Sequence, residues 1–318
     1  VAGFRSLLEE SVSMRLRADV PVACYLSGGL DSCAILGLAA RLRQDPIHAF
    51  TLRFSDARYD EGPIAEAMAR LAGAEHTTIE VKEDDLADSF TDAVVHAEAP
   101  CSNAHGVAKF LLSRCVRDAG FKVVLTGEGA DEVLAGYPHF RQDLLHFDSE
   151  DLTESEKQER LSALSASNEV SRGRLLAVRK SEGPAALHSR LGFIPSWLET
   201  HLAARGSHRL PLNFDFLQPL LQRDGGQLLA EEIDWKRRLD GRRPVDQAAY
   251  LWAKTMLPNY ILTMLGDRME MAHSIEGRLP FLDHEVGEFL NRVALQHKIR
   301  GSVEKHLLRE AARDVLTD

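Results

Sequence analysis

A short glycine-rich segment between two apolar runs constrains the fold of this chain more than any other feature. The segment SGGLDS, residues 27–32, follows an apolar run over 20–26 and precedes a second one over 33–40. An apolar run, a glycine pair and another apolar run are typical of a buried strand, a tight turn and a helix. The sequence therefore predicts a strand–turn–helix unit, in which the first N–H groups of the helix and its dipole favour an anion in the turn.

The residues of this turn suit a phosphate group. Gly28 and Gly29 let the backbone come close to a ligand, and the hydroxyl groups of Ser27 and Ser32 can donate hydrogen bonds to it. Asp31 would repel an anion unless a cation lay between them, which indicates Mg²⁺. The spacing is not that of a Walker A loop, which needs Gly-Lys-Ser/Thr after a longer spacer. An ordinary strand-to-helix turn is the alternative, and the complete hexapeptide in this context argues against it.

The first part of the chain alternates between helical and strand patterns. Strands separated by helices predict a parallel sheet covered by helices on both faces, which is an α/β fold. Because ligands bind beyond the carboxyl ends of such strands, the loops after Leu26 and Thr126 are expected at the same edge of the sheet. Helices are expected over residues 4–17, 31–42, 61–71 (ended by Gly73), 84–98 and 105–118, and strands over 20–26, 48–54, 76–81 and 122–126.

From about residue 140 onward the strand signal fades. Helical patterns are expected over 152–164, 172–188 and 197–204. A long apolar segment over 247–264 is expected to be interrupted at Pro258. We therefore predict two parts, an α/β core over residues 1–140 and a mostly helical region over residues 141–318.

Composition limits the classes of function. The 318 residues carry a formal net charge of −10 and 44% of them are hydrophobic, which fits a folded acidic protein and argues against a general nucleic-acid surface. No apolar run reaches the length of a membrane span, and no signal peptide is visible at the start. The four cysteines make no CxxC pair, so free thiols in a reducing cytoplasm are the simplest account.

A second glycine-rich segment holds three carboxylates directly after an expected strand. It reads TGEGADE over residues 126–132 and is followed by Gly136-Tyr137. Carboxylates crowded at a strand end are costly unless cations compensate them, so Asp31 and Asp131 could share Mg²⁺ that neutralises a triphosphate. Glu128 would then be free to act on the substrate or the nucleophile. A solvated acidic turn is the alternative, and the presence of the first glycine-rich segment favours the functional interpretation.

Four segments, spread over almost the whole chain, together resemble the synthetase domain of the class B, glutamine-dependent asparagine synthetases, which belong to the ATP pyrophosphatase superfamily. The first two are the glycine-rich segments just described. The third resembles the family's DRMSMAHSxExRxPFLD signature, and it consists of residues 267–269 and 271–274, then Glu276, Arg278 and 280–283. The fourth, EKHLLR over 304–309, resembles the family's KxxLR segment. Their common order makes the resemblance strong.

The resemblance implies that the chain uses ATP and Mg²⁺. Thr126 stands where the family has serine, and it keeps the hydroxyl group. The implied contacts are Ser27, Gly28, Gly29 and Ser32 for the pyrophosphate of ATP, Tyr25 and Leu52 for adenosine, Thr126 and Gly127 for the nucleotide, and Asp31 and Asp131 for Mg²⁺.

The resemblance also implies two catalytic residues. Glu128 would accept a proton from attacking ammonia during amide formation. Lys305 would stabilise negative charge on the α-phosphate during adenylation, a task that suits a compact point charge. A surface lysine paired with Glu304 or Glu310 is the alternative for Lys305.

Three residues of the third segment are candidates for binding the substrate. They are Arg268, Glu276 and Arg278. Arg268 could hold a substrate carboxylate in a fork, and Arg278 could pair with Glu276. A structural role, in which the arginines join the helical region to the sheet, is equally open.

The implied reaction is ATP-dependent asparagine synthesis. The β-carboxylate of aspartate attacks the α-phosphorus of ATP to give β-aspartyl-AMP and pyrophosphate, and ammonia then displaces AMP. Amidotransferases of secondary metabolism, β-lactam synthetases and lasso-peptide cyclases use the same adenylation with another acid or an internal amine, and the intact GEGADE segment favours asparagine synthetase. A catalytically idle regulatory domain is less favoured, because all the expected charged residues are present. A tRNA-modifying pyrophosphatase is less favoured still, because the chain is acidic and lacks a cysteine pair.

Two departures from the family bear on the partners. The family carries an N-terminal glutaminase domain whose first residue is a nucleophilic cysteine, whereas this chain begins at Val1 and its earliest cysteine is Cys24. The chain also stops at Asp318, where the family usually runs on. We therefore expect the synthetase portion of a longer cytoplasmic protein, with aspartate and ammonia as substrates and a glutaminase domain upstream or in trans. A homodimer is left open, and no nucleic-acid or membrane partner is expected.

Overall fold

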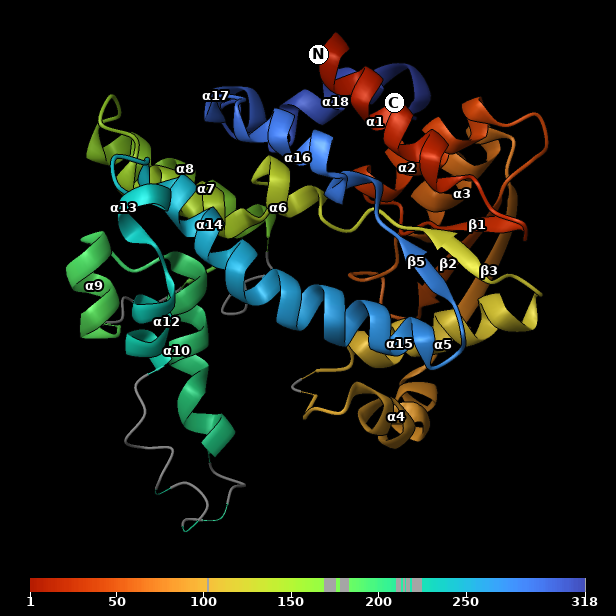
Figure 1. Ribbon diagram of the computed structural model, residues 1–318, viewed down its shortest axis with the longest axis horizontal. Helices are drawn as coiled ribbons and strands as arrows, with labels where there is room; N and C mark the ends of the chain where they lie inside the picture. Colours follow the sequence, from red (N-terminus) through yellow and green to blue (C-terminus); the bar gives the residue numbers. More distant parts are fainter. Residues whose placement is uncertain are drawn as a thin grey trace. The chain divides into compact units, whose positions relative to one another are not determined.

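The structure, a computed structural model, describes residues 1–101, 103–168, 176–177, 183–209, 213, 215, 218 and 225–317. The chain divides into two units (Figure 1). The first unit joins Val1–Leu134 to Ala253–Asp318, and the second is Ala135–Trp252. The end of the chain therefore belongs with its beginning, while the predicted division at residue 140 stays a prediction about folding domains.

Five parallel strands form the sheet of the first unit, in the order β3-β2-β1-β4-β5 (Figure 1). They are β1 (Val22–Tyr25), β2 (His48–Phe54), β3 (Glu75–Val81), β4 (Val123–Leu125) and β5 (Glu276–Arg278). The predicted α/β fold with a parallel sheet is confirmed, and the four strands expected from the sequence all form. Since β1 and β4 are neighbours, the loops that follow them leave the sheet at the same edge.

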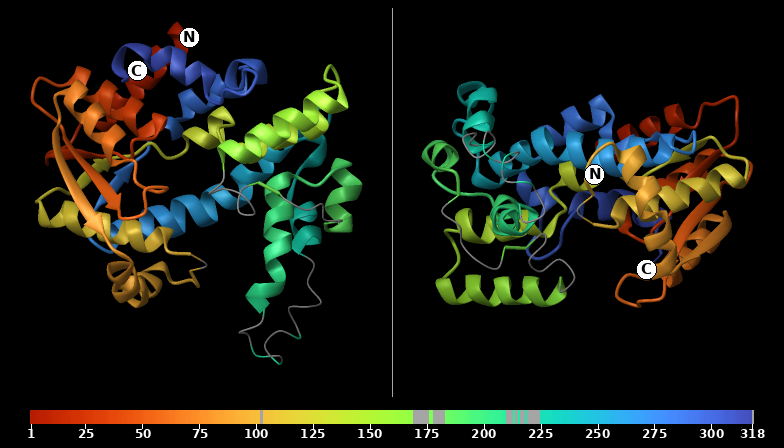
Figure 2. Two further views of the ribbon diagram at one scale, coloured as in Figure 1. Left: turned by 180° about the vertical axis from the view of Figure 1, so that it is seen from behind. Right: turned by 90° about the horizontal axis from the view of Figure 1, so that it is seen from below.

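Successive side chains of β1 alternate between the two faces of this sheet. Helices cover both faces (Figure 2). Val22 and Cys24 belong to the larger hydrophobic core, whereas Ala23 and Tyr25 belong to a smaller one. The larger core is covered by α1 (Ala2–Arg15), α2 (Leu30–Leu42), α3 (Gly62–Ala72), α16 (His284–Asn291) and α18 (His306–Ala312), and the smaller one by α5 (His105–Asp118), on which α4 (Glu83–Ala97) and α15 (Arg268–Met271) pack. Short elements complete the unit: α6 (Ala130–Leu134), η3 (Pro280–Leu282), α17 (Leu295–Lys298) and η4 (Arg313–Val315).

Two glycines fix helix ends beside the sheet. Gly28 has a φ of 84°, and a Cβ there would lie 2.8 Å from the carbonyl oxygen of Glu61, so glycine is required where the chain passes from β1 into α2. Gly73 ends α3, as the sequence predicts, and it does so in the left-handed conformation with a φ of 61°.

The second half of the chain departs from the prediction in two places. Residues Glu276–Arg278 form a strand that pairs with β4, whereas the sequence predicts a helical region from residue 141 onward. Three residues are too few to show a two-residue alternation, so pairing rather than local pattern decides this strand. The chain is also not interrupted at Pro258, because α14 (Pro244–Met256) passes directly into the π-helix η2 (Leu257–Asp267). The change of helical register accommodates a residue that has no N–H to donate.

The described residues of the second unit are mainly helical. The helices expected over 152–164 and 197–204 are confirmed. Of the helix expected over 172–188, residues 172–175 and 178–182 lie outside the described residues, and in the described part a helix begins only at Ala185. The elements are α7 (Pro138–Phe147), α8 (Glu154–Ser167), α9 (Ala185–Leu191), α10 (Ser196–Arg209), α12 (Gly225–Glu232), α13 (Trp235–Arg238) and α14, in which the chain leaves this unit.

No helix within the described ranges combines the length and the apolar character that crossing a bilayer requires.

Candidate active site

The two glycine-rich loops meet at the carboxyl edge of the sheet. In the first loop, the Ser32 hydroxyl accepts a hydrogen bond from the Ser27 N–H (3.1 Å), lies 3.0 Å from the Ser27 hydroxyl and donates to the Gly29 carbonyl (3.0 Å). The second loop packs against the first, because a Cβ at Gly127 would lie 2.7 Å from the backbone nitrogen of Ser32. Thr126 is buried beside it, and its hydroxyl accepts a hydrogen bond from the backbone two residues on. The prediction that these loops share one edge is confirmed.

Lys305 joins the two loops through their aspartates. Its Nζ lies 2.6 Å from Asp31 Oδ2 and 2.7 Å from Asp131 Oδ1. Lys305 is 8% exposed and precedes α18 with a φ of 51°. The alternative of a surface lysine paired with Glu304 or Glu310 is wrong, because those glutamates pair with Arg309 and Arg313.

Burial and charge shift the pKa values of this cluster. Burial raises the pKa of Asp31 to about 7, with the Asp131 charge acting in the same direction and the Lys305 ammonium acting against it. Burial acts to lower the pKa of Lys305, but the carboxylates of Asp131 and Asp31 outweigh it, so that the pKa is raised. Lys305 is therefore a fixed positive charge at the edge where the turn favours an anion.

The two aspartates fit a magnesium site. Asp31 Oδ1 is buried and accepts no hydrogen bond from the described residues, and the Asp131 side chain is 27% exposed. Two carboxylates together with phosphate oxygens are a usual set of ligands for Mg²⁺ bound with a nucleotide. No cluster of three or more histidine, cysteine, aspartate or glutamate side chains suited to a metal occurs in the part of the chain that the structure describes.

Glu128 belongs to a second lysine cluster, which the sequence analysis does not predict. Lys109 Nζ lies 2.6 Å from Glu128 Oε1 and 3.0 Å from Glu270 Oε1, and it stands 4.7 Å from the ring centroid of Tyr25. The two glutamate charges outweigh burial and raise the pKa of Lys109, while burial raises the pKa of Glu270. The sequence does hold a weak signal, since Lys109 falls within the apolar stripe of α5 and Glu270 stands between two methionines.

Tyr25 and Leu52 both belong to the core under α5. The Tyr25 hydroxyl lies 2.9 Å from Ser113 Oγ, and Tyr25 is 7% exposed. Leu52 is half-buried against the same core. Their contact with adenosine stays a prediction.

The three candidate substrate residues all make contacts within the first unit. Arg268 donates to the Ala97 carbonyl and lies 3.3 Å from Glu98, which joins α15 to the end of α4. Arg278 pairs with Glu276 at 2.7 Å, as the sequence analysis allows. Arg278 also donates to the carbonyls of residues 15 and 17, at 2.7 and 2.8 Å, which ties β5 to the end of α1. These contacts fit the structural alternative for the arginines, and substrate binding stays a prediction.

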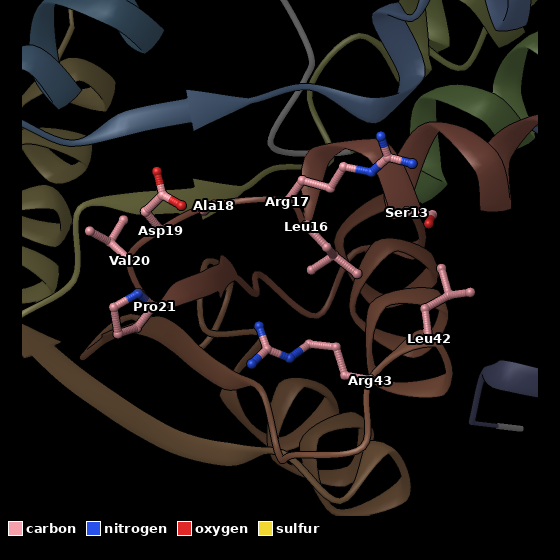
Figure 3. Close-up of a pocket in the computed structure, with 9 residues that line it drawn as sticks. All are labelled: Ser13, Leu16, Arg17, Ala18, Asp19, Val20, Pro21, Leu42 and Arg43. Carbon is pink, nitrogen blue, oxygen red and sulfur yellow. The ribbon is translucent and has the colours of Figure 1, made fainter.

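A pocket of about 550 Å³ lies elsewhere in this unit (Figure 3). It is lined by the segment before β1, including Asp19 and Pro21, and by Leu42 and Arg43 at the end of α2. These residues stand at the amino end of β1, and the glycine-rich loops follow the carboxyl ends of β1 and β4. The pocket is therefore separate from the predicted site.

A solved structure with partial likeness is the NH3-dependent NAD synthetase of Campylobacter jejuni, which is 14% identical and covers 73% of this chain and 96% of that chain. The TM-score is 0.32, and the five-stranded parallel sheet itself defines the fold class.

Sequence comparison is more informative. Amidase chyE of Penicillium rubens is 32% identical, covering 100% of this chain and 50% of the relative. A putative glutamine-hydrolyzing asparagine synthetase of Mycobacterium tuberculosis is 30% identical, covering 98% of this chain and 45% of the relative. The chain thus spans about half the length of these curated relatives. Residues 3–318 match the family model described as asparagine synthase, and the chain therefore belongs to the asparagine synthase family.

Proposed function

We propose that this chain is the synthetase part of an ATP-dependent, amide-forming ligase. The reaction would have two steps, which are adenylation of a carboxylic acid with release of pyrophosphate, and displacement of AMP by a nitrogen nucleophile. The observation that carries the proposal is the meeting of Lys305, Asp31 and Asp131 beside the turn into α2. Family membership supports the same class of reaction.

In the first step, the turn into α2 would bind the pyrophosphate of ATP. Ser27, Gly28, Gly29 and Ser32 offer hydroxyl and N–H groups there, and the N-terminus of α2 favours negative charge. When bound, Mg²⁺ held by Asp31 and Asp131 would neutralise the phosphates. Lys305 would stabilise the charge that develops on the α-phosphate, and its position between two carboxylates fixes that charge before ATP binds.

In the second step, Glu128 would take the proton of the nucleophile. The nitrogen lone pair attacks the acyl carbon, the bond from that carbon to the AMP oxygen breaks, and AMP leaves with the electron pair. The proton lost by nitrogen passes to the Glu128 carboxylate. The Glu128 side chain is 26% exposed, so a small nucleophile can reach it.

Aspartate is the acid that the family resemblance favours. A different acid is the second candidate, and one specific observation favours it: a relative of 32% identity over the whole chain is named an amidase rather than an asparagine synthetase. Both candidates use the same adenylation. The mycobacterial relative is named as glutamine-hydrolyzing, so we propose ammonia as the nucleophile and a glutaminase domain elsewhere in the full-length protein, or in trans, as its source.

Pyrophosphate release tests this proposal directly. The full-length protein is supplied with ATP, Mg²⁺ and ammonium, with aspartate or with a panel of other carboxylic acids. Release that depends on aspartate, with asparagine appearing in step, supports asparagine synthesis. Release with another acid keeps the mechanism and changes the substrate, and silence with every acid overturns the proposal.

A further inference from the structure

The three side chains of the cluster, Glu128, Lys109 and Glu270, differ in how deeply they are buried. The side-chain exposure falls from 26% at Glu128 to 13% at Lys109 and 3% at Glu270. The three residues come from the loop after β4, from α5 and from α15, so the fold and not one local motif assembles them. Glu128 is therefore the member that a substrate meets, and the other two lie behind it.

One glycine makes room for the Glu270 side chain, and a second glycine lies beside Glu128. A Cβ at Gly277, on β5, would lie 2.1 Å from Glu270 Oε2, so the Glu270 carboxylate occupies the space that any other residue would fill. A Cβ at Gly266, at the end of η2, would lie 3.6 Å from Glu128 Oε2. Within the described residues, Oε1 of Glu128 is the oxygen bound to Lys109, and Oε2 is the oxygen directed toward Gly266.

The net charge of the cluster affects how strongly Glu128 can bind a proton. A lysine paired with Glu128 alone would neutralise it and lower its affinity for a proton. Glu270 shares the same ammonium, so the three side chains together carry one negative charge. Among the described residues, two other titratable groups act on the cluster, which are Tyr25, on β1, and Asp267, at the end of η2.

We propose that Lys109 and Glu270 are positioning residues for the amide-forming step. This inference rests on the proposed function, in which Glu128 accepts the proton of the nucleophile. Lys109 holds Oε1 of Glu128 and leaves Oε2 to receive the proton, while Glu270 balances the ammonium so that Glu128 remains a base. Neither residue is needed for adenylation, which takes place at Lys305, Asp31 and Asp131.

Glu270 is also the residue of the third segment that the family signature does not match. Residues 267–269 and 271–274 follow the signature, and residue 270 stands between them as glutamate instead of serine. Because Gly277 is what gives Glu270 its space, the two residues form a matched pair in this chain.

The test separates the two half-reactions in the full-length protein with ammonium as the nitrogen source. Acid-dependent exchange of labelled pyrophosphate into ATP measures adenylation, and single-turnover decay of the preformed acyl-adenylate measures amide formation. In Lys109→Met and Glu270→Gln, we expect exchange to stay within about threefold of the parent protein. Amide formation should fall about 10- to 100-fold, which is part of the contribution of a general base. Lys109→Arg should recover part of the loss.

The pH dependence of amide formation gives a readout that a purely structural role would not move. Removing the Lys109 charge should raise the pKa of the base and shift the acidic limb of the profile to higher pH. Removing the Glu270 charge should shift the same limb to lower pH. The exposed residues Arg114, on α5, and Glu288, on α16, provide the matched controls Arg114→Met and Glu288→Gln, which should leave both half-reactions and both profiles unchanged.

Different outcomes overturn different statements. If exchange falls together with amide formation in a folded variant, or if the acidic limb stays in place in both variants, the positioning role is wrong. If the parent protein shows no exchange with any acid, the proposed function fails, and this inference fails with it. Should Lys109→Met not fold, Glu270→Gln and Lys109→Arg decide the question, because each keeps the shape and hydrogen bonding of the original side chain more closely.

Discussion

The first unit contains two lysines that each bridge two carboxylates, and they differ in what surrounds them. Lys305 lies between Asp31 and Asp131, beside a turn whose serines and N–H groups can bind phosphate. Lys109 lies between Glu128 and Glu270 and over an aromatic ring, and Gly277 leaves the space that Glu270 occupies. The same arrangement of one lysine and two carboxylates thus occurs in two different environments.

The difference teaches how one charge pattern can support two kinds of chemistry. In the Lys305 cluster both aspartates can still coordinate a cation, since Asp31 Oδ1 accepts no hydrogen bond from the described residues and Asp131 is partly exposed. In the Lys109 cluster Glu270 is buried and Glu128 is partly exposed. The first suits stabilisation of phosphate charge, and the second suits control of a single base.

Removing Lys305 should cause the largest effect. Lys305→Ala takes away the positive charge assigned to the α-phosphate, and we expect pyrophosphate exchange to fall by about 10³-fold or more, at the upper end of the loss of one stabilising group. The fold should persist, because Lys305 precedes α18 and is not part of the helix. Far-ultraviolet circular dichroism, which reports helix content, checks this. Lys122→Ala, an exposed lysine of the same unit, is the control. Substantial exchange in Lys305→Ala would contradict the assigned role.

The second prediction asks whether the two clusters divide the reaction. Glu128→Gln removes the base but keeps the hydrogen bond to Lys109 within reach, so amide formation should fall about 10²- to 10³-fold while pyrophosphate exchange changes little. Rapid-quench measurement of acyl-adenylate and amide in one experiment checks this. An equal loss of both would mean that Glu128 acts in adenylation as well.

Much of the fold can be predicted because its signals are local. Four strands and the helices between them follow from runs of apolar residues, and Gly73 ends α3 as a left-handed C-terminal residue should. The strand β5 could not be predicted, since a three-residue strand owes its existence to pairing with β4. The predicted interruption at Pro258 is wrong for the opposite reason. Proline is a strong local signal for a break, but here it lies within the π-helix η2, whose hydrogen-bond pattern accommodates it.

The residues of the site likewise divide into those that the sequence predicts and those that it does not. Asp31, Asp131, Glu128 and Lys305 stand in recognisable segments, and the structure brings Asp31 and Asp131 each within hydrogen-bond distance of Lys305. Lys109 and Glu270 stand in no such segment. Their role depends on contacts between α5, α15 and the loop after β4, and a sequence pattern does not report contacts of that kind.

A buried carboxylate that pairs with no lysine of the described residues sharpens the comparison. Asp143, in the second unit, accepts hydrogen bonds from the Ser196 N–H (2.9 Å) and hydroxyl (2.6 Å), and burial raises its pKa to about 7. Because the folded pKa lies above the unfolded value, the native state holds the proton longer, and the contribution of Asp143 to stability falls as pH rises from about 4 to about 7. The change is on the order of 4 kcal/mol at its limit.

Tryptophan fluorescence can measure this effect, because all three tryptophans of the chain lie in the second unit. Urea unfolding of the parent protein and of Asp143→Asn is compared between pH 4 and pH 7. The parent should lose stability relative to the variant as pH rises. Burial lowers the pKa of His139 and acts in the opposite direction, but it is common to both proteins and cancels in the difference. A constant difference across this range would contradict the prediction.

The smallest predicted effect concerns the space that Gly277 leaves for Glu270. In Gly277→Ala the new methyl group would overlap the Glu270 carboxylate, and we expect a loss of about 1–3 kcal/mol of stability, as for other overpacked sites. Hydrogen exchange of the β4 and β5 amides measures it in the first unit. The double change Gly277→Ala with Glu270→Ser should restore the stability but not the rate of amide formation. Gly287→Ala on α16, where a Cβ meets nothing within 4 Å, is the control. Recovery of both properties in the double variant would mean that Glu270 fills space and does not tune Glu128, and the two lysine clusters would then differ in structure but not in function.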